Sequence, residues 1–134
     1  MRFNEREGYR CDFLSFNLRV SLRRLIMAKL ERDFQGQLVK ELKERFPGAI
    51  VTKLDSSYIQ GIPDLLILYK DKWATLECKK SGKASKRPNQ NYYVDKMNEM
   101  SFSSFIYPEN KNEVLNGIQQ AFEPQEPARI PECE

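Results

Sequence analysis

A hairpin of two short strands is the feature that most constrains the fold of this chain. Leu65 to Tyr69 form a continuous apolar run, which is typical of a buried central strand. The charged residues 70–72 then turn the chain into an alternating segment that ends in Glu77-Cys78-Lys79. We therefore expect the two segments to pair as a hairpin at the centre of a sheet.

The segments around this hairpin alternate between helical and strand patterns. An apolar residue at every fourth position predicts a helix that Pro47-Gly48 ends; these residues are Leu30, Phe34, Leu38, Leu42 and Phe46. Strands are predicted over 49–54 and 102–107, and a final helix over 109–122. Another helix starts near Asn89, and its expected apolar face consists of Tyr92, Tyr93, Met97 and Met100. This order predicts an α/β fold with an αβββαβ core, in which helices flank a mixed sheet.

Length and composition are those of one small domain with an extension at each end. The chain has 134 residues, of which 40% are hydrophobic and 31% are charged, as in ordinary soluble globular proteins. The domain is predicted to span 29–122, and the proline-containing tail 123–134 to be disordered. No apolar run is long enough to cross a membrane, so no membrane partner is expected.

Residues 1–28 form a basic N-terminal arm. Six arginines and three acidic residues in this arm account for the whole net charge of +3. Leu14, Leu18, Leu22 and Leu25 fall at near-helical spacing. One interpretation is a short amphipathic helix that packs on the domain or contacts nucleic acid, and the other is an appendage without function. Met27 is an alternative translation start, which would make the arm a non-native extension.

The absence of histidine excludes several reaction classes. Ser-His and Cys-His nucleophiles, histidine-metal nucleases and zinc deaminases all need this residue. The three cysteines are odd in number and widely spaced, which supports neither a disulfide framework nor a zinc site and makes the cytoplasm the expected compartment. Any chemistry must therefore use carboxylates, lysine and a hard metal ion.

The predicted hairpin brings two carboxylates and a lysine together. Asp64 opens the first strand, while Glu77 and Lys79 share one face near the end of the second. Adjacent carboxylates repel each other, and a divalent cation would relieve that repulsion. Oxygen ligands favour Mg²⁺ or Mn²⁺ over zinc, and the backbone carbonyl of Cys78 is a further candidate ligand. Lys79 could orient a water, act as its base or stabilise charge on a phosphate.

Each of these features also has a structural interpretation. A Pro-Asp pair often only starts a strand, and a Glu-x-Lys sequence is usually a solvated charge pair. The segment after Lys79 is expected to contact DNA phosphates through Lys80, Lys83, Lys86 and Arg87. A solvated basic loop is the alternative there.

The combination of motifs resembles the PD-(D/E)xK nuclease superfamily, and most closely the VRR-Nuc type of phage and bacterial Holliday-junction resolvase-like enzymes. The pattern consists of Gly61-Ile62-Pro63-Asp64, a hairpin-length interval and Glu77-Cys78-Lys79. The resemblance covers Lys29 to Phe122 and implies a restriction-endonuclease-like fold.

The resemblance also implies further site residues. Family members carry an acidic metal-site residue near the start of the first helix and a glutamine or glutamate four residues later, which Glu31 and Gln35 match. Gln35 is an alternative to Glu31 as the ligand. Gln90 matches a glutamine near the start of the next helix, whereas Met100-Ser101 stands where the family commonly has a glycine.

The resemblance therefore implies a Mg²⁺- or Mn²⁺-dependent endodeoxyribonuclease. Its metal ligands would be Asp64, Glu77, the Cys78 carbonyl and Glu31, and its catalytic lysine would be Lys79. The implied substrate is branched DNA such as a Holliday junction, cut by a homodimer in a bacterial or phage-infected cytoplasm. The alternatives are a nuclease for unbranched DNA and a non-catalytic nucleic-acid-binding or interaction domain with a vestigial site.

Overall fold

The computed structural model describes residues 8–125, with side chains from residue 15 onward. Its elements in chain order are α1 (Gly8–Arg45), β1 (Ile50–Lys53), β2 (Leu65–Tyr69), β3 (Lys72–Cys78), α2 (Pro88–Met100), β4 (Phe102–Ile106) and α3 (Lys111–Phe122). This order is the predicted one. Residues 1–7 of the arm and 126–134 of the tail lie outside the described residues, and the division into arm, domain and tail stays a prediction.

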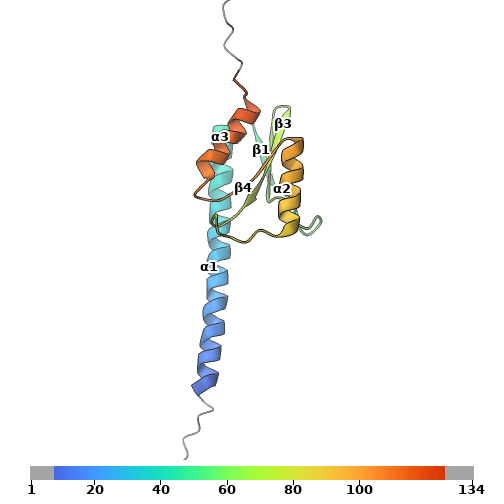
Figure 1. The fold of residues 1–134 in the computed structure, drawn as a ribbon. Helices are drawn as coiled ribbons and strands as arrows, with labels where there is room; N and C mark the ends of the chain where they lie inside the picture. Colours follow the sequence, from blue (N-terminus) through green and yellow to red (C-terminus); the bar gives the residue numbers. More distant parts are fainter. Residues whose placement is uncertain (1–7, 126–134) are drawn as a thin grey trace, which may run out of the picture.

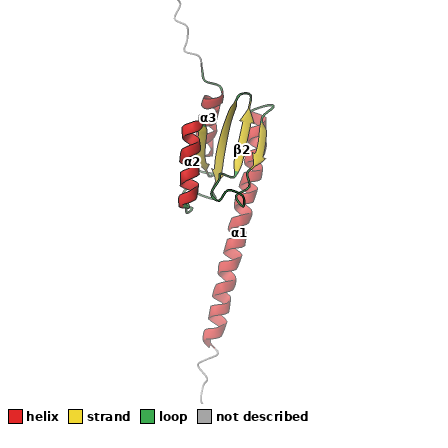
Figure 2. Ribbon diagram, turned by 90° about the vertical axis from the view of Figure 1, so that its right-hand side faces the viewer, coloured by secondary structure: helices red, strands yellow, loops and turns green. Residues whose placement is uncertain are grey.

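The strands form one four-stranded mixed sheet in the order β1-β2-β3-β4 (Figure 2). β2 pairs antiparallel with β1 and β3, whereas β3 and β4 are parallel. The predicted hairpin is the central pair, with Tyr69 opposite Lys72 at its turn and Leu65 opposite Leu76 at its open end. The predicted mixed sheet flanked by helices is therefore confirmed.

The helices cover both faces of the sheet, with α1 and α3 on one side and α2 on the other (Figure 1). The main hydrophobic core lies between the sheet and the α1–α3 layer. β3 contributes Ala74, Leu76 and Cys78 to this core. Because side chains alternate along a strand, Thr75 and Glu77 are directed toward the other face, which α2 covers.

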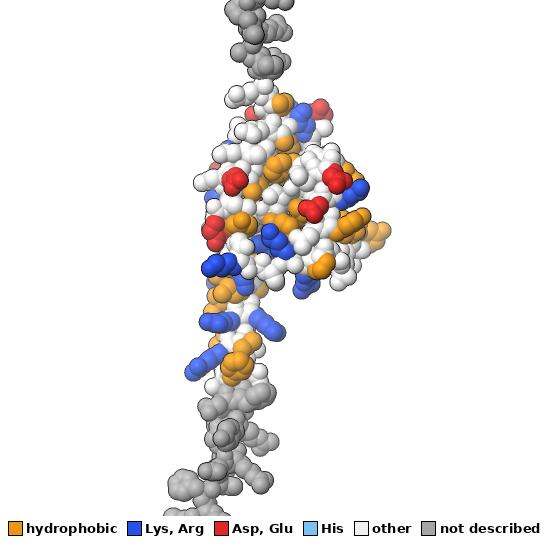
Figure 3. Space-filling model, viewed as in Figure 1, with side chains coloured by type: hydrophobic (Ala, Val, Ile, Leu, Met, Phe, Trp, Pro, Cys, Tyr) orange, Lys and Arg blue, Asp and Glu red, His pale blue; other side chains and the backbone are white. Residues whose placement is uncertain are grey.

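The first helix is longer than predicted, because it begins at Gly8 and continues without a break through the arm. Leu38, Leu42 and Phe46 are buried, but Leu30, at the start of the predicted stripe, is 52% exposed. A spacing of four residues drifts by about 40° per step around an α-helix, so the stripe turns away from the sheet. The described arm extends past the domain and exposes its apolar and basic side chains (Figure 3), so it does not pack on the domain.

The predicted apolar face of α2 is partly wrong. Tyr92 and Met100 are 61% and 64% exposed, and the buried residue of this helix is Val94. Tyr93 and Met97 are half-buried, as expected. The residues of α2 that meet the sheet are spaced three or four positions apart, beginning at Gln90 in the first turn. Tyr92 lies outside this face.

The turn between α2 and β4 forms without the glycine that the family commonly has there. Ser101 ends the helix with φ −153°, and its amide donates to the Met97 carbonyl. This φ is negative and lies outside the left-handed region that favours glycine, so serine can occupy the position. Among the described residues, no helix combines the length and the apolar character that a membrane span requires.

Candidate active site

Asp64 is held at the open end of the hairpin by two strands. Its Oδ2 accepts a hydrogen bond of 2.8 Å from the Cys78 amide at the end of β3. Its carbonyl accepts one of 2.9 Å from the Leu54 amide just after β1. Because β2 and β3 are antiparallel, the start of β2 lies beside the end of β3, which places Asp64 next to the Glu77-Cys78-Lys79 segment.

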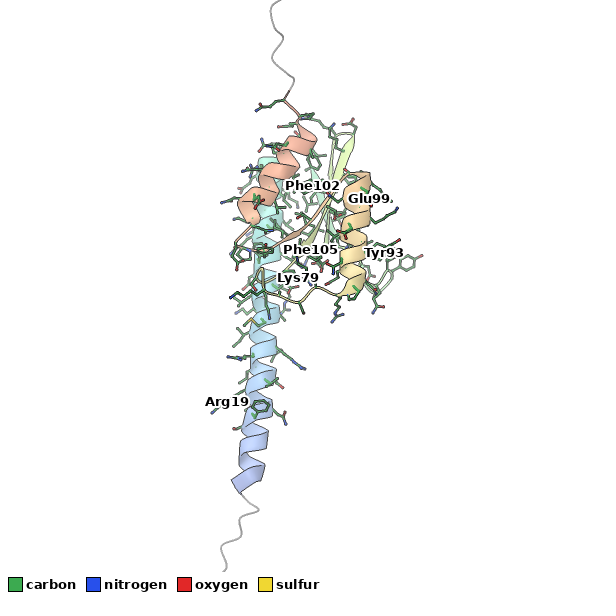
Figure 4. All side chains as sticks on the ribbon, in the orientation of Figure 1. Arg19, Lys79, Tyr93, Glu99, Phe102 and Phe105 are labelled. Carbon is green, nitrogen blue, oxygen red and sulfur yellow. The ribbon has the colours of Figure 1, made fainter. Side chains whose placement is uncertain are left out.

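Glu77, Gln90 and Lys79 form a hydrogen-bonded network beside Asp64. The Gln90 Nε2 donates to Glu77 Oε1 at 2.5 Å, and its Oε1 accepts from Lys79 Nζ at 2.8 Å. Lys79 Nζ also lies 3.5 Å from Glu77 Oε1. The first turn of α2 therefore fixes both charged groups of the Glu-x-Lys motif. Lys79 lies at the end of the sheet between α1 and α2 (Figure 4).

Three carboxylates share an environment that disfavours their ionised forms. Burial, assisted by the charge of Asp64, raises the pKa of Glu77 to about 7, and Lys79 opposes this rise. Burial also raises the pKa of Asp64, which the Cys78 amide partly offsets. The pKa of Glu31, from α1, is raised by burial and by the charge of Asp64. The structure thus brings these predicted acids into one electrostatic cluster.

The donor chemistry of this cluster fits a hard divalent cation. Within the described residues, the hydrogen bonds of the network use Asp64 Oδ2 and Glu77 Oε1, which leaves the second oxygen of each carboxylate for a cation. No group of three or more His, Cys, Asp or Glu side chains in this part of the chain is arranged to hold a metal ion. Two carboxylates completed by other oxygens are a ligand set that Mg²⁺ often takes.

The remaining predicted ligands have different surroundings. Gln35 is buried one helical turn after Glu31 and stays an alternative to it. The Cys78 thiol belongs to the hydrophobic core, so only the backbone of this residue is relevant to a metal. The Cys78 carbonyl stays a predicted ligand.

The four cations predicted to contact DNA are all exposed. Burial raises the pKa of Glu31, and the charge of Lys80 offsets a small part of that rise, so this lysine lies near the acidic cluster. Lys86 Nζ lies 4.4 Å from the centre of the Phe105 ring, and the Arg87 amide donates to Gln90 Oε1 at 3.1 Å. The basic loop is therefore joined to the site at its beginning and at its end.

A cavity of about 230 Å³ lies against the two central carboxylates. Its lining comprises Ser56, Gln60, Gly61 and Ile62 from the loop before β2, then Asp64 and Glu77, and finally Arg87, Asn89 and Gln90 from the start of α2. The sequence analysis assigned no role at the site to Ser56, Gln60 or Asn89. Gly61, two residues before Pro63, was the available signal that another segment approaches closely there.

Comparisons with known proteins give one structural neighbour. No protein-family model matches the chain, and no curated protein matches it. A solved structure described as a VRR_NUC domain is 26% identical, with coverage of 63% of this chain and 92% of that one and a TM-score of 0.48.

Proposed function

We propose that this protein is a metal-dependent endonuclease that hydrolyses DNA phosphodiesters. The observation that carries the proposal is the Glu77–Gln90–Lys79 network beside Asp64. Paired carboxylates with raised pKa values and an adjacent fixed lysine are the groups that metal-assisted phosphodiester hydrolysis uses.

The residues that would hold Mg²⁺ or Mn²⁺ are Asp64 and Glu77, with the Cys78 carbonyl and either Glu31 or Gln35 as further ligands. A bound ion would polarise the scissile phosphate and lower the pKa of a water. Gln90 orients the Glu77 carboxylate by donating to its Oε1. Lys79 keeps its ammonium group within the network, where it can donate to a phosphate oxygen and stabilise the negative charge that develops during hydrolysis.

DNA would be bound by the basic loop that follows the catalytic lysine. Lys80, Lys83, Lys86 and Arg87 are exposed and can contact backbone phosphates. Binding through such contacts releases counterions, so the affinity should fall steeply as salt rises.

The test is a cleavage assay with plasmid, duplex, flap and four-way-junction DNA in Mg²⁺, in Mn²⁺ and in EDTA. We expect nicking only with metal, and its loss in Asp64→Asn and Lys79→Ala. The control variants are Asp71→Asn, in the turn between β2 and β3, and Lys96→Ala, on α2. Both residues are exposed and lie away from the site, so these variants should cleave like the wild type. Undiminished cleavage by Asp64→Asn would refute the assignment.

Holliday-junction selectivity and cleavage by a homodimer are finer parts of the same proposal. They predict faster cutting of the junction than of a duplex with the same sequence, and a dimer in sedimentation of the active protein. Equal rates on both DNAs would favour a nuclease for unbranched DNA.

A non-catalytic nucleic-acid-binding domain is the second candidate. It is favoured by the absence of a ready group of three metal-binding side chains among the described residues. This candidate predicts salt-sensitive DNA binding that is unaffected by Asp64→Asn, together with no cleavage in any metal.

A further inference from the structure

The loop between β1 and β2 begins and ends at the candidate site. The hydrogen bond from the Leu54 amide to the Asp64 carbonyl closes its base. Inside the loop, Asp55 Oδ1 accepts from the amide and the hydroxyl of Ser57, at 2.8 and 2.6 Å. The Asp55 carbonyl accepts from the Tyr58 amide at 3.2 Å. The loop is therefore held by its own hydrogen bonds in a fixed position relative to Asp64.

The far side of the same loop rests on the start of α2. Gly61 has φ +93°, and a Cβ at this position would lie 2.5 Å from the Asn89 Cβ. Only glycine allows so close an approach in this backbone conformation. The cavity beside Asp64 and Glu77 lies between this loop and α2.

Tyr58 is the most exposed large hydrophobic residue that the structure describes, at 87%. In the sequence it lies midway between Ser56 and Gln60, which both line the cavity. An aromatic ring left in water on an ordered loop offers apolar area and a π-face at little entropic cost. This position suits a ligand that approaches the site and carries a flat ring.

We propose that Tyr58 stacks on an unpaired base of the DNA whose phosphodiester is cut at Asp64 and Glu77. The inference rests on the proposed nuclease function and specifies its substrate class as DNA with an unpaired nucleotide next to the cleaved bond. Within a continuous duplex, both faces of every base are covered by stacked neighbours. Only an unpaired or extruded base presents a face to a ring outside the helix.

This division of roles separates affinity from selectivity. Cations of the basic loop bind phosphates of paired and unpaired DNA alike. Tyr58 adds a contact that only unpaired DNA can make, since stacking tolerates any base but needs a free face. Selection for unpaired nucleotides thus follows from one side chain on the loop that Asp64 closes.

Binding is tested without cleavage, in the Asp64→Asn background and in EDTA. Fluorescence anisotropy compares a duplex with the same duplex carrying a single-stranded flap. Tyr58→Ala should weaken flap binding on the order of tenfold and leave duplex binding unchanged, whereas Tyr58→Phe keeps the ring and should bind like tyrosine. Ile50→Ala removes another exposed apolar side chain, on β1, and should change neither affinity. Circular dichroism verifies that each variant is folded.

Photocrosslinking identifies the contact directly. The flap carries 5-iodouracil at its unpaired nucleotides, and mass spectrometry of the irradiated complex should place the adduct on Tyr58. An equal loss of flap and duplex binding in Tyr58→Ala, or an adduct on Tyr92 with Tyr58→Ala binding normally, would overturn the proposal. Both readouts are independent of catalysis. A wild-type protein that cuts no DNA would therefore refute the nuclease function in a separate experiment.

Discussion

Glu77 is a carboxylate with only 3% of its surface exposed, in contact with Gln90 and Lys79. Removing its ionised form from water is costly, so burial raises the pKa of Glu77 from 4.5 to about 7. The network only partly compensates, because Asp64 and Glu31 are nearby acids. Binding a proton or a cation would relieve the electrostatic cost of this buried negative charge.

The raised pKa of Glu77 predicts how stability depends on pH in the absence of metal. Because the folded protein holds this proton more tightly than the unfolded chain, the stabilisation is complete below pH 4.5 and is lost as the pH rises through about 7. Glu77→Gln keeps a neutral group at every pH. In EDTA, it should therefore unfold at higher urea concentration than the wild type at pH 8, with a much smaller difference at pH 5.

The control for this prediction is Glu44→Gln, which changes an exposed glutamate on α1. Its effect on the urea midpoint should be small at both pH values. A Glu77→Gln effect of the same size at pH 5 and pH 8 would contradict the burial of an ionisable Glu77.

At the residue scale, sequence and structure agree best where neighbours in the chain or across the hairpin decide the geometry. Asp64, Glu77 and Lys79 meet because hairpin pairing alone aligns their strand ends. Gln90 contacts Glu77 from another element, and only the resemblance pointed to it. Asn89 was missed because its role depends on how α2 is placed against the loop.

At the element scale, replacing two glycines by alanine should change the stability in opposite directions. Gly61 has φ +93° and touches Asn89, so Gly61→Ala should destabilise the fold by about 2–4 kcal/mol. Gly36 lies inside α1 with nothing within 4 Å of an added Cβ, so Gly36→Ala should stabilise it by about 1 kcal/mol. Urea unfolding of both variants measures the two effects. A neutral Gly61→Ala would show that the loop does not rest on α2.

The β2–β3 turn contains the one described non-glycine residue with positive φ, Lys70 at 56°. A side chain in this left-handed conformation costs about 1–2 kcal/mol, and glycine avoids that cost. Lys70→Gly should therefore be more stable than Lys70→Ala by about 1 kcal/mol in thermal or urea unfolding. The comparison with alanine matters because both variants lose the contact of Lys70 Nζ with the Tyr69 ring. Equal stability would mean that the turn adjusts to relieve the strain.

Strands were easier to predict than helix ends and helix faces. β2 has the predicted bounds, since an apolar run between polar turns marks a buried strand at both ends. For α1 the periodic stripe, apart from the exposed Leu30, marked the part that packs against the core, whereas the helix itself continues to Gly8. A helix needs no tertiary contact to satisfy its backbone hydrogen bonds, so its length can exceed its buried face.

At the scale of the whole molecule, the arm contributes little to the packed domain. Apart from the half-buried Val20, its described side chains are exposed, including Phe16, Leu18 and Leu22. A chain that starts at Met27 should therefore unfold at nearly the same urea concentration as the full chain, while losing helical circular dichroism signal. Its DNA cleavage should also be unchanged, because the site residues all follow Met27. A large loss of stability would show that the arm supports the domain.

Local periodicity and pairing across one short turn were enough to predict the αβββαβ order, the central hairpin and the meeting of Asp64 with the Glu77 strand. The folded structure was needed to show which face of α2 meets the sheet, how α1 leaves it, and that the loop carrying Tyr58 closes at Asp64 and rests on Asn89. Those features depend on contacts between elements far apart in the chain. Such contacts follow from the three-dimensional fit of side chains and backbone, which no single segment encodes.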